Sequence, residues 1–242
     1  MAPVSQQKAG QNGWSSLEEL AEDVRGCTLC GLSQSRTKAV PGEGSPTAQI
    51  MFIGEGPGYN EDQQGRPFVG RAGKLLDDLL ASVPLTRSDV FITNVVKCRP
   101  PENRDPQQDE VEACKGYLDA QIRLIDPRVI VTLGRHSLAR FFPDARISRD
   151  HGKMMRWDGR IVYPLYHPAA GLRSADVLEK LKDDFKRLPA AVVESLRTPG
   201  GSQAEAPRVR EPVREYTAAA RTDGTPGTDP EAGGDGKQLG LL

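Results

Sequence analysis

The sequence lacks several features that would place it in other protein classes. No segment is long and apolar enough to cross a bilayer, and the N-terminal residues do not form the apolar core of a signal peptide. There is no excess of one charge either, since 32 Lys and Arg stand against 33 Asp and Glu for a formal net charge of −1. We therefore expect a cytoplasmic protein without a membrane segment, in which any nucleic-acid contact uses a local basic surface.

Cysteine is scarce, and the four cysteines are spaced unevenly. Cys27 and Cys30 form a C-x2-C pair, whereas fifteen residues separate Cys98 from Cys114. Two disulfides are rare in the reducing cytoplasm. Four thiolates suit either structural zinc or a [4Fe–4S] cluster, and ordinary buried cysteines are the remaining interpretation. Zinc ribbons usually supply a second tight pair, so the wide second pair favours the cluster.

The glycine-rich stretch from Gly54 to Gly73 lacks the features of the common phosphate-binding loops. No Gly-Lys-Ser/Thr closes it as in a Walker loop, and its first three glycines alternate, which differs from Gly-x-Gly-x-x-Gly. Such a turn lets backbone N–H groups face a ligand closely. Its carboxylates would repel a nucleotide triphosphate, so the composition favours a flat, uncharged, hydrogen-bonding ligand that is attached to phosphate. A turn with only a packing role is the alternative.

Strands and helices are expected to alternate along most of the chain. The predicted strands are 50–53, 90–94, 129–133 and 161–165, and the predicted helices are 73–82, 106–125, 135–141 and 175–196. This order predicts a three-layer α/β/α sandwich around a central, mostly parallel four-stranded sheet. A helix capped by Ser15 or Ser16 should precede it, and a hairpin should join 154–157 to 160–163. We expect a folded domain over 14–197 between a disordered segment 1–13 and a disordered tail 198–242.

The chemically distinctive residues follow predicted strands. Gly54–Gly58 come after the first strand, Asn94 ends the second, and His167 lies just past the fourth. Parallel sheets bind ligands beyond the carboxyl ends of their strands. We therefore expect these segments to form one site. We expect His136 and His151 to have structural roles, because neither lies at the carboxyl end of a predicted strand.

Together these segments resemble one family. Gly54-Glu55-Gly56-Pro57-Gly58, Glu61-Asp62, Gly65-Arg66-Pro67-Phe68-Val69-Gly70, Ile92-Thr93-Asn94-Val95-Val96-Lys97-Cys98-Arg99-Pro100 and His167-Pro168-Ala169 resemble the family 4 uracil-DNA glycosylases, which carry an iron–sulfur cluster. The resemblance covers about residues 17–190, and the motifs occur in the family's order. It implies hydrolysis of the N-glycosidic bond of uracil in single- and double-stranded DNA, a uracil-DNA glycosylase-like fold, and a [4Fe–4S] cluster on Cys27, Cys30, Cys98 and Cys114.

The resemblance also implies roles for residues near the expected site. Phe68 would stack on the flipped base, Asn94 would pair with its O4 and N3–H edge, and His167 would donate to O2 as negative charge builds there. The best-known glycosylase group has an Asp at the position of Gly56, and that Asp positions the water. Since this chain has Gly56 among its uracil-binding residues, the catalytic carboxylate is Glu55 or Glu61, and the sequence leaves that choice open.

Several residues are expected to contact DNA. Leu172 is placed to wedge into the base stack, with Arg173 on a phosphate. Basic side chains at Arg66, Arg71, Lys97 and Arg99 are the other predicted contacts. A relative of this family that crosslinks to uracil carries an inserted basic loop with a nucleophilic His. Here Arg99 runs directly into Pro100 without such an insert, so the resemblance implies turnover and not covalent attachment to DNA. No lysine nucleophile is evident, so we expect a monofunctional enzyme without a strand-cleaving step.

Two further interpretations remain open. The first is a non-catalytic module that uses the cluster to bind nucleic acid or to recognise uracil, although such a module need not keep Glu55, Asn94 and His167. The second concerns the last residues, Gln238–Leu242, which resemble the short peptides that bacterial sliding clamps accept on a flexible tether. A monomer is the default expectation.

Overall fold

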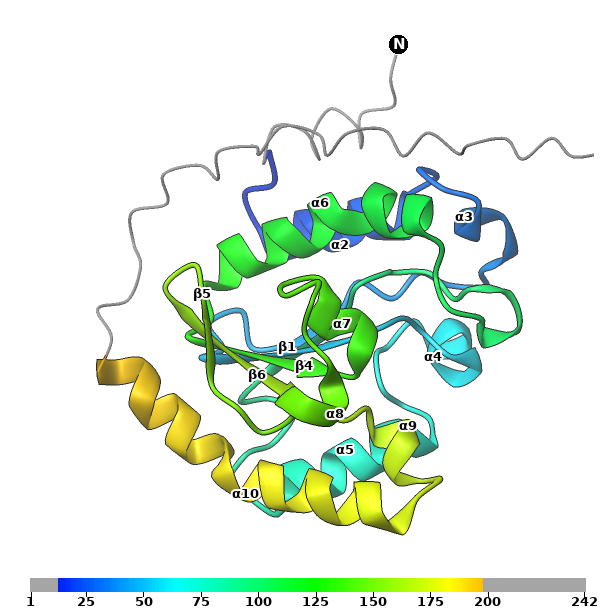
Figure 1. Ribbon diagram of the computed structural model, residues 1–242. Coiled ribbons are helices and arrows are strands. Elements are labelled where there is room, and N and C mark those ends of the chain that lie inside the picture. Colours follow the sequence, from blue (N-terminus) through cyan, green and yellow to red (C-terminus); the bar gives the residue numbers. More distant parts are fainter. Residues whose placement is uncertain (1–12, 198–242) are drawn as a thin grey trace, which may run out of the picture. The chain divides into compact units, whose positions relative to one another are not determined.

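A six-stranded mixed sheet runs through the computed structural model, which describes residues 13–197 (Figure 1). Its strands are β1 (Glu43–Gly44), β2 (Ile50–Gly54), β3 (Phe91–Asn94), β4 (Val129–Leu133), β5 (Met155–Trp157) and β6 (Arg160–Leu165). The order is β1-β3-β2-β4-β6-β5, in which the four central strands are parallel and both edge strands are antiparallel. The parallel centre agrees with the prediction, but the predicted number of strands is wrong because β1 and β5 extend the sheet at its edges.

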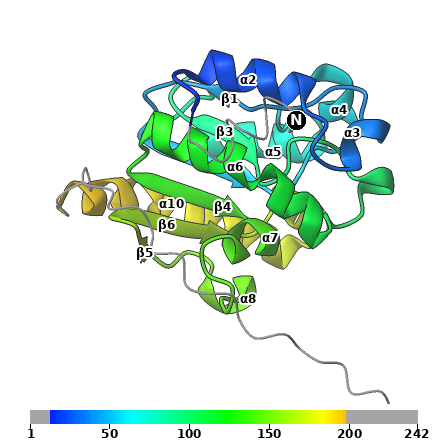
Figure 2. The same cartoon turned by 90° about the horizontal axis from the view of Figure 1, so that it is seen from above.

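Helices cover both faces of this sheet. They are α2 (Leu17–Gly26), α3 (Leu32–Ser35), α4 (Tyr59–Gln64), α5 (Arg71–Ala81), the 3-10 turn η1 (Pro101–Asn103), α6 (Gln108–Ile125), α7 (Arg135–Ala139), α8 (Ile147–Asp150), α9 (Pro168–Gly171) and α10 (Ala175–Arg197). Figures 1 and 2 show α2 and α6 together on one face, and Figure 1 shows α5 and α10 on the other. Ser16 caps α2 by accepting a hydrogen bond from the N–H of Glu19, as predicted.

Each face has its own apolar core, because successive side chains of a strand point to opposite sides. Met51 and Ile53 of β2 pack toward α2 and α6, where Trp14 and Tyr117 lie with ring centroids 5.2 Å apart. Phe52 points the other way and stacks on Phe185 of α10 at 5.9 Å. The central strands are buried on both faces, which explains why they are continuous apolar runs in the sequence.

The carboxyl ends of the parallel strands meet at one edge of the sheet. In the register between β2 and β3, Gly54 lies opposite Asn94, and between β4 and β6 Leu133 lies opposite Leu165. The segments that follow these four strands therefore start side by side. The predicted hairpin joins β5 to β6 through Asp158 and Gly159, both of which have positive φ, and lies at the far edge of the sheet.

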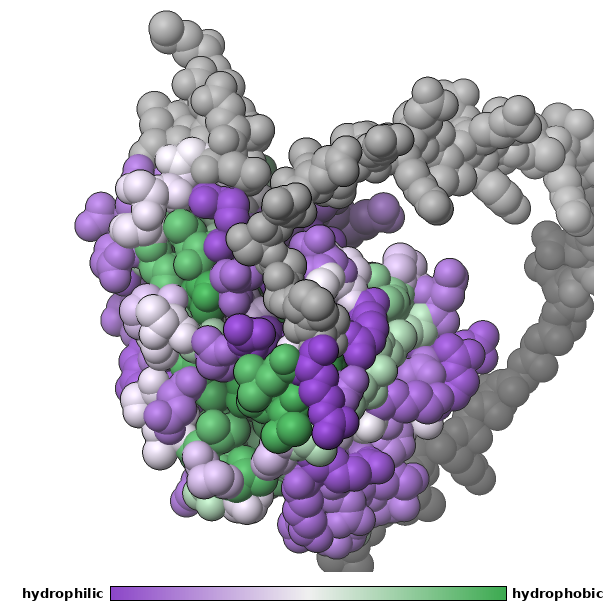
Figure 3. Space-filling model, turned by 90° about the vertical axis from the view of Figure 1, so that its left-hand side faces the viewer, coloured by the Kyte–Doolittle hydropathy of each residue, from purple (hydrophilic) through white to green (hydrophobic). Residues whose placement is uncertain are grey.

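Part of the surface near β5 and the end of α10 is apolar. Figure 3 views the molecule from this side, where apolar residues lie at the surface between hydrophilic ones. Met154, Val193 and Leu196 are among the exposed large apolar residues, and Val193 is 55% exposed. Helix α10 thus carries both fully buried and freely exposed apolar side chains.

No helix of residues 13–197 is long and apolar enough to span a membrane. The disorder predicted for 198–242 and the predicted clamp-binding peptide Gln238–Leu242 lie outside the described residues, as does all of segment 1–13 except Gly13. These points, and the monomeric state, stay predictions.

Replacing Phe185 by Ala should lower the free energy of unfolding by about 3–5 kcal/mol, because the fully buried ring leaves a cavity beside Phe52. The matched variant on the same helix, Val193→Ala, should change it by less than about 0.5 kcal/mol since Val193 is exposed. Urea denaturation followed by circular dichroism measures both. Similar losses in the two variants would contradict the packing described for α10.

Candidate active site

A cleft of about 640 Å³ opens at the carboxyl ends of β2, β3, β4 and β6. It brings together segments that lie far apart in the chain: the glycine-rich turn after β2, the end of β3, the start of α7 and the turn before α9. Its lining includes Glu55, Gly56, Glu61, Phe68, Asn94, Asp105, His136, Tyr166, His167 and Arg173. The segments after these strand ends thus line one cleft, and its use as a ligand site stays a prediction.

Asn94, the last residue of β3, is only 1% exposed, and its Oδ1 has no hydrogen-bond partner. A buried acceptor without a partner costs about 1–3 kcal/mol. Gly54 makes the close approach of this amide possible, because a Cβ there would lie 2.4 Å from Oδ1. The carboxamide oxygen is therefore placed to accept a hydrogen bond from a ligand in the cleft.

Phe68 lies beside Asn94 in an unusual backbone conformation. Its φ is +51°, in the left-handed region that residues other than glycine rarely adopt. Its ring lies 5.6 Å from the His167 ring and would be 2.6 Å from a Cβ on Gly54. The ring is 94% buried yet lines the cleft, which places an aromatic face where a planar ligand can stack.

His167 is the N-cap residue of α9, and its hydrogen bond fixes which nitrogen carries the proton. Nδ1 accepts a hydrogen bond from the N–H of Ala169 at 3.1 Å. Burial and, to a smaller extent, the nearby positive charge of Arg173 together lower the pKa of His167 to about 4. The imidazole is therefore neutral near pH 7 with its proton on Nε2, where it acts as a hydrogen-bond donor.

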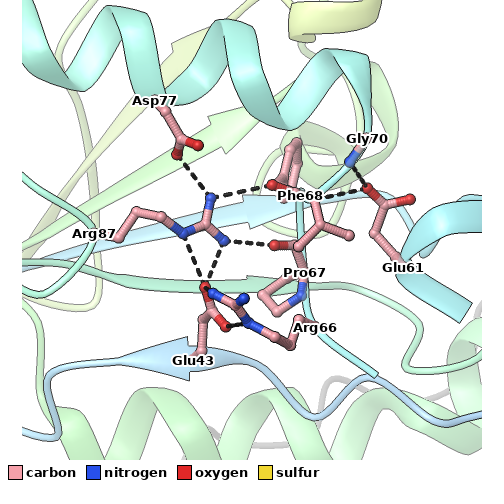
Figure 4. A network of polar contacts seen from close by, with 9 residues as sticks. Glu43, Glu61, Arg66, Pro67, Phe68, Gly70, Asp77 and Arg87 are labelled. Carbon is pink, nitrogen blue, oxygen red and sulfur yellow. Dashed lines mark hydrogen bonds and ion pairs between the residues drawn. The ribbon is translucent and has the colours of Figure 1, made fainter. Parts of the chain in front are cut away.

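Glu61 holds the backbone of the glycine-rich stretch. Its Oε1 accepts hydrogen bonds from the N–H groups of Val69 and Gly70, both at 2.8 Å (Figure 4). Its Oε2 accepts one from the N–H of Gly58 at 3.1 Å. Both carboxylate oxygens are thus engaged with the main chain.

Glu55 has a different environment. Its side chain is 30% exposed and its Oε2 lies 3.7 Å from Nε2 of His136. Burial raises the pKa of Glu55, an effect that His136 opposes and Asp105 reinforces. The expectation that His136 lies away from a strand end is wrong, because α7 begins two residues after the end of β4 and carries His136 into the cleft.

An ion network surrounds Glu55. The ligand atoms of Glu55, Asp105 and His136 lie within 4.8 Å of one another, which is a spacing that metal ligands also show. The guanidinium of Arg135, however, donates to His136 Nε2 at 2.8 Å and to Asp105 at 2.5 Å. The positive charge of Arg135 thus already neutralises part of this network, and Glu55 lines the cleft.

Lys97 does not lie on the surface, so the prediction of a phosphate contact there is wrong. It is 1% exposed, and its Nζ donates to Thr93 Oγ1, to the carbonyl oxygen of Asn94 and to Gln121 Oε1, at 2.6–2.8 Å. Burial lowers the pKa of Lys97 to about 8. Its role is to hold the end of β3, which carries Asn94.

The other residues predicted to contact DNA are not buried. Arg173 lines the cleft and Leu172 beside it is 42% exposed. Arg99 lies over the ring of Tyr59 at 5.3 Å from its centroid. Arg71 and Arg66 are exposed, and Arg66 pairs with Glu43. Their contact with DNA stays a prediction.

The four cysteines line a second, small cavity between α2, α3, α6 and the loop after β3. Arg36 Nη1 donates to Cys98 Sγ at 2.9 Å, and the backbone N–H of Lys97 donates to Cys114 Sγ at 3.3 Å. Burial raises the pKa of Cys114 to about 12 and also raises those of Cys30 and Cys98. These raised pKa values favour neutral thiols, and a metal centre is one group that would stabilise their thiolate forms.

Comparison with known proteins agrees with this geometry. The family model of the Uracil DNA glycosylase superfamily matches residues 41–189. A type-4 uracil-DNA glycosylase of Sulfurisphaera tokodaii is 52% identical over 183 residues, which cover 72% of this chain and 83% of the relative. A type-4 enzyme of Saccharolobus solfataricus is 48% identical, over 73% of this chain and 87% of the relative. One of Archaeoglobus fulgidus is 46% identical, over 72% of this chain and 92% of the relative.

The matched region contains the cleft residues between β2 and α10 that carried the resemblance in the sequence. The resemblance is therefore confirmed, and the chain belongs to the Uracil DNA glycosylase superfamily, in its type-4 group.

Proposed function

We propose that this protein releases uracil from single- and double-stranded DNA by hydrolysing the N-glycosidic bond, leaving an abasic site for base-excision repair. The observation that carries the proposal is the partnerless, buried Oδ1 of Asn94, with Phe68 and His167 beside it in the same cleft. A pyrimidine that turns out of the helix would supply the missing donor.

Each of these side chains meets a different part of the base. Phe68 stacks on the ring, and the Asn94 carboxamide accepts from N3–H and donates to O4. Gly56 also lines the cleft, and it packs so closely against Val96 that a Cβ there would lie 2.8 Å from Val96 Cγ2. His167 Nε2 donates to O2, where negative charge grows as the glycosidic bond breaks. A neutral imidazole suits this role because it stabilises the anion by hydrogen bonding without losing its own proton.

Glu55 is the carboxylate that acts on the sugar side. The two oxygens of Glu61 accept hydrogen bonds from backbone N–H groups. Glu55 is instead partly exposed at the cleft, and burial raises its pKa. A carboxylate in this position orients a water molecule or stabilises the cationic sugar that develops in the transition state. Arg173 and Leu172 flank the cleft for contacts with the DNA strand.

An oligonucleotide with one uracil, treated with protein and then alkali, tests the function. Glu55→Gln should lower the single-turnover rate of uracil release by about 10²–10⁴-fold. Since burial raises the pKa of Glu55, the wild-type rate should rise as pH increases through that raised pKa, and this acid limb should disappear in Glu55→Gln. Glu61→Gln is the matched control. It should lower the melting temperature, because Glu61 binds the main chain, and it should lower the rate less than Glu55→Gln does.

Two results would contradict these assignments. A larger loss of rate in Glu61→Gln than in Glu55→Gln would move the catalytic role to Glu61. Absence of any alkali-labile break with folded wild-type protein would instead favour the non-catalytic nucleic-acid-binding module. An oligonucleotide with thymine at the same position controls for uracil-independent cleavage.

We also infer that Cys27, Cys30, Cys98 and Cys114 hold a [4Fe–4S] cluster. The cavity that they line and the N–H groups directed at their sulfurs support this assignment. Among the described residues no three of these sulfurs lie within 4.8 Å of one another, whereas a single zinc ion would hold them roughly 3.8 Å apart. When bound, the cluster cross-links α2, α6 and the loop after β3.

Purified protein should therefore be brown and contain iron and acid-labile sulfide in equal amounts. Cys114→Ser should lose the visible absorption and lower the melting temperature, because the buried site loses a ligand. Ser33→Ala changes a residue of the same cavity that is not a thiol, and it should keep both properties. Colourless protein with bound zinc would refute the cluster.

A further inference from the structure

The backbone at residues 67–70, here called the Phe68 loop, is held in a costly conformation. A non-glycine residue at φ +51° costs of order 1–3 kcal/mol and persists only where its surroundings hold it. The loop also packs tightly on α5, because a Cβ on Gly73 would lie 1.8 Å from the carbonyl oxygen of Phe68. The position of the Phe68 ring therefore depends on what holds this loop.

Polar groups hold the Phe68 loop from two sides (Figure 4). Glu61 accepts the N–H groups of its second half, as described above. Arg87, which lies between α5 and β3, binds the carbonyl oxygens of its first half. Nη2 of Arg87 donates to Pro67 at 2.5 Å, and Nη1 donates to Phe68 at 3.1 Å.

Arg87 is itself fixed by two carboxylates. Glu43 Oε1 accepts from Nε at 2.8 Å and from Nη2 at 2.6 Å, and Asp77 Oδ1 accepts from Nη1 at 2.8 Å. The five N–H groups of the guanidinium thus make five hydrogen bonds to four acceptor atoms, two of which are the carbonyl oxygens of the Phe68 loop. A lysine has three donors on one nitrogen and cannot reproduce this planar arrangement.

We propose that Arg87 is a positioning residue for base recognition: held by Glu43 and Asp77, it keeps the Phe68 ring where the flipped base stacks. The proposal rests on the proposed function. Arg87 does not line the cleft, so it acts only through Phe68. Loss of Arg87 lets the Phe68 loop relax toward an ordinary backbone conformation, and the ring then leaves the face of the base.

A double-mutant cycle separates this role from a general contribution to folding. Arg87→Met should lower the single-turnover rate of uracil release about tenfold in the wild-type background. In the Phe68→Leu background the same change should lower it less than about twofold, because the ring that Arg87 positions is already gone. For variants whose turnover is too slow to follow, the same cycle is measured with dissociation constants. These come from titration with an oligonucleotide that carries non-hydrolysable 2′-fluoro-deoxyuridine.

Arg160→Met is the matched control. Arg160 is also largely buried, and it also binds two carboxylates and a carbonyl oxygen, those of Asp126 and Asp158. It lies at the start of β6, at the opposite end of the strands from the cleft. Arg160→Met should lower the melting temperature, as Arg87→Met does, but should keep the wild-type rate of uracil release.

Arg87→Lys keeps the positive charge beside Glu43 and Asp77, and therefore covers the case in which Arg87→Met fails to fold. It should show the same loss of rate and the same coupling to Phe68 as Arg87→Met. Equal losses in both backgrounds, or full activity of Arg87→Lys, would overturn the proposal. If the wild-type protein and Arg160→Met both fail to release uracil, the proposed function is wrong, whereas an additive cycle in an active enzyme refutes only the role of Arg87.

Discussion

The approach of Asn94 and Phe68 to Gly54 is the contact on which the cleft depends. The parallel register of β2 and β3 places Gly54 opposite Asn94, and both the amide oxygen and the aromatic ring lie closer to Gly54 than any Cβ would allow. Backbone pairing in the sheet therefore sets where the Asn94 amide lies relative to Gly54, and the Phe68 ring packs against the same glycine. Side-chain rotamers adjust this geometry only slightly, because both residues are buried.

Burial gives the polar groups of the cleft different tasks. It keeps His167 neutral, and the hydrogen bond that Nδ1 accepts leaves the proton on Nε2. Glu55 and Glu61 are close in sequence, but their surroundings separate their roles: one faces the cleft within an ion network, and the other satisfies three backbone N–H groups. The same residue type thus holds loop geometry in one place and, in the function proposed here, takes part in catalysis in the other.

The sequence predicted those parts of the fold and site that local patterns determine. The four central strands are continuous apolar runs, and the motif residues follow strand ends, so both could be predicted. The two-residue strand β1 is too short for any periodicity, and it exists only because β3 pairs with it. The prediction that Lys97 contacts DNA is wrong because its partner Gln121 is 24 residues away in the sequence. A basic residue beside a cysteine gives no sign that it is buried. Arg87 carries no local signal at all, since its partners lie on three separate elements.

Lys97 links the cysteine cavity to the cleft. Its backbone N–H donates to Cys114 Sγ, and its ammonium donates to the carbonyl oxygen of Asn94. One residue therefore bonds both to a thiol of the cysteine site and to the strand end that presents the Asn94 amide to the cleft. Because a buried ammonium is costly unless its donors are satisfied, Lys97 stays in place only while Thr93, Asn94 and Gln121 keep their positions. Lys97 thus links order at the cysteine site to order at Asn94, although none of the cysteines lines the cleft.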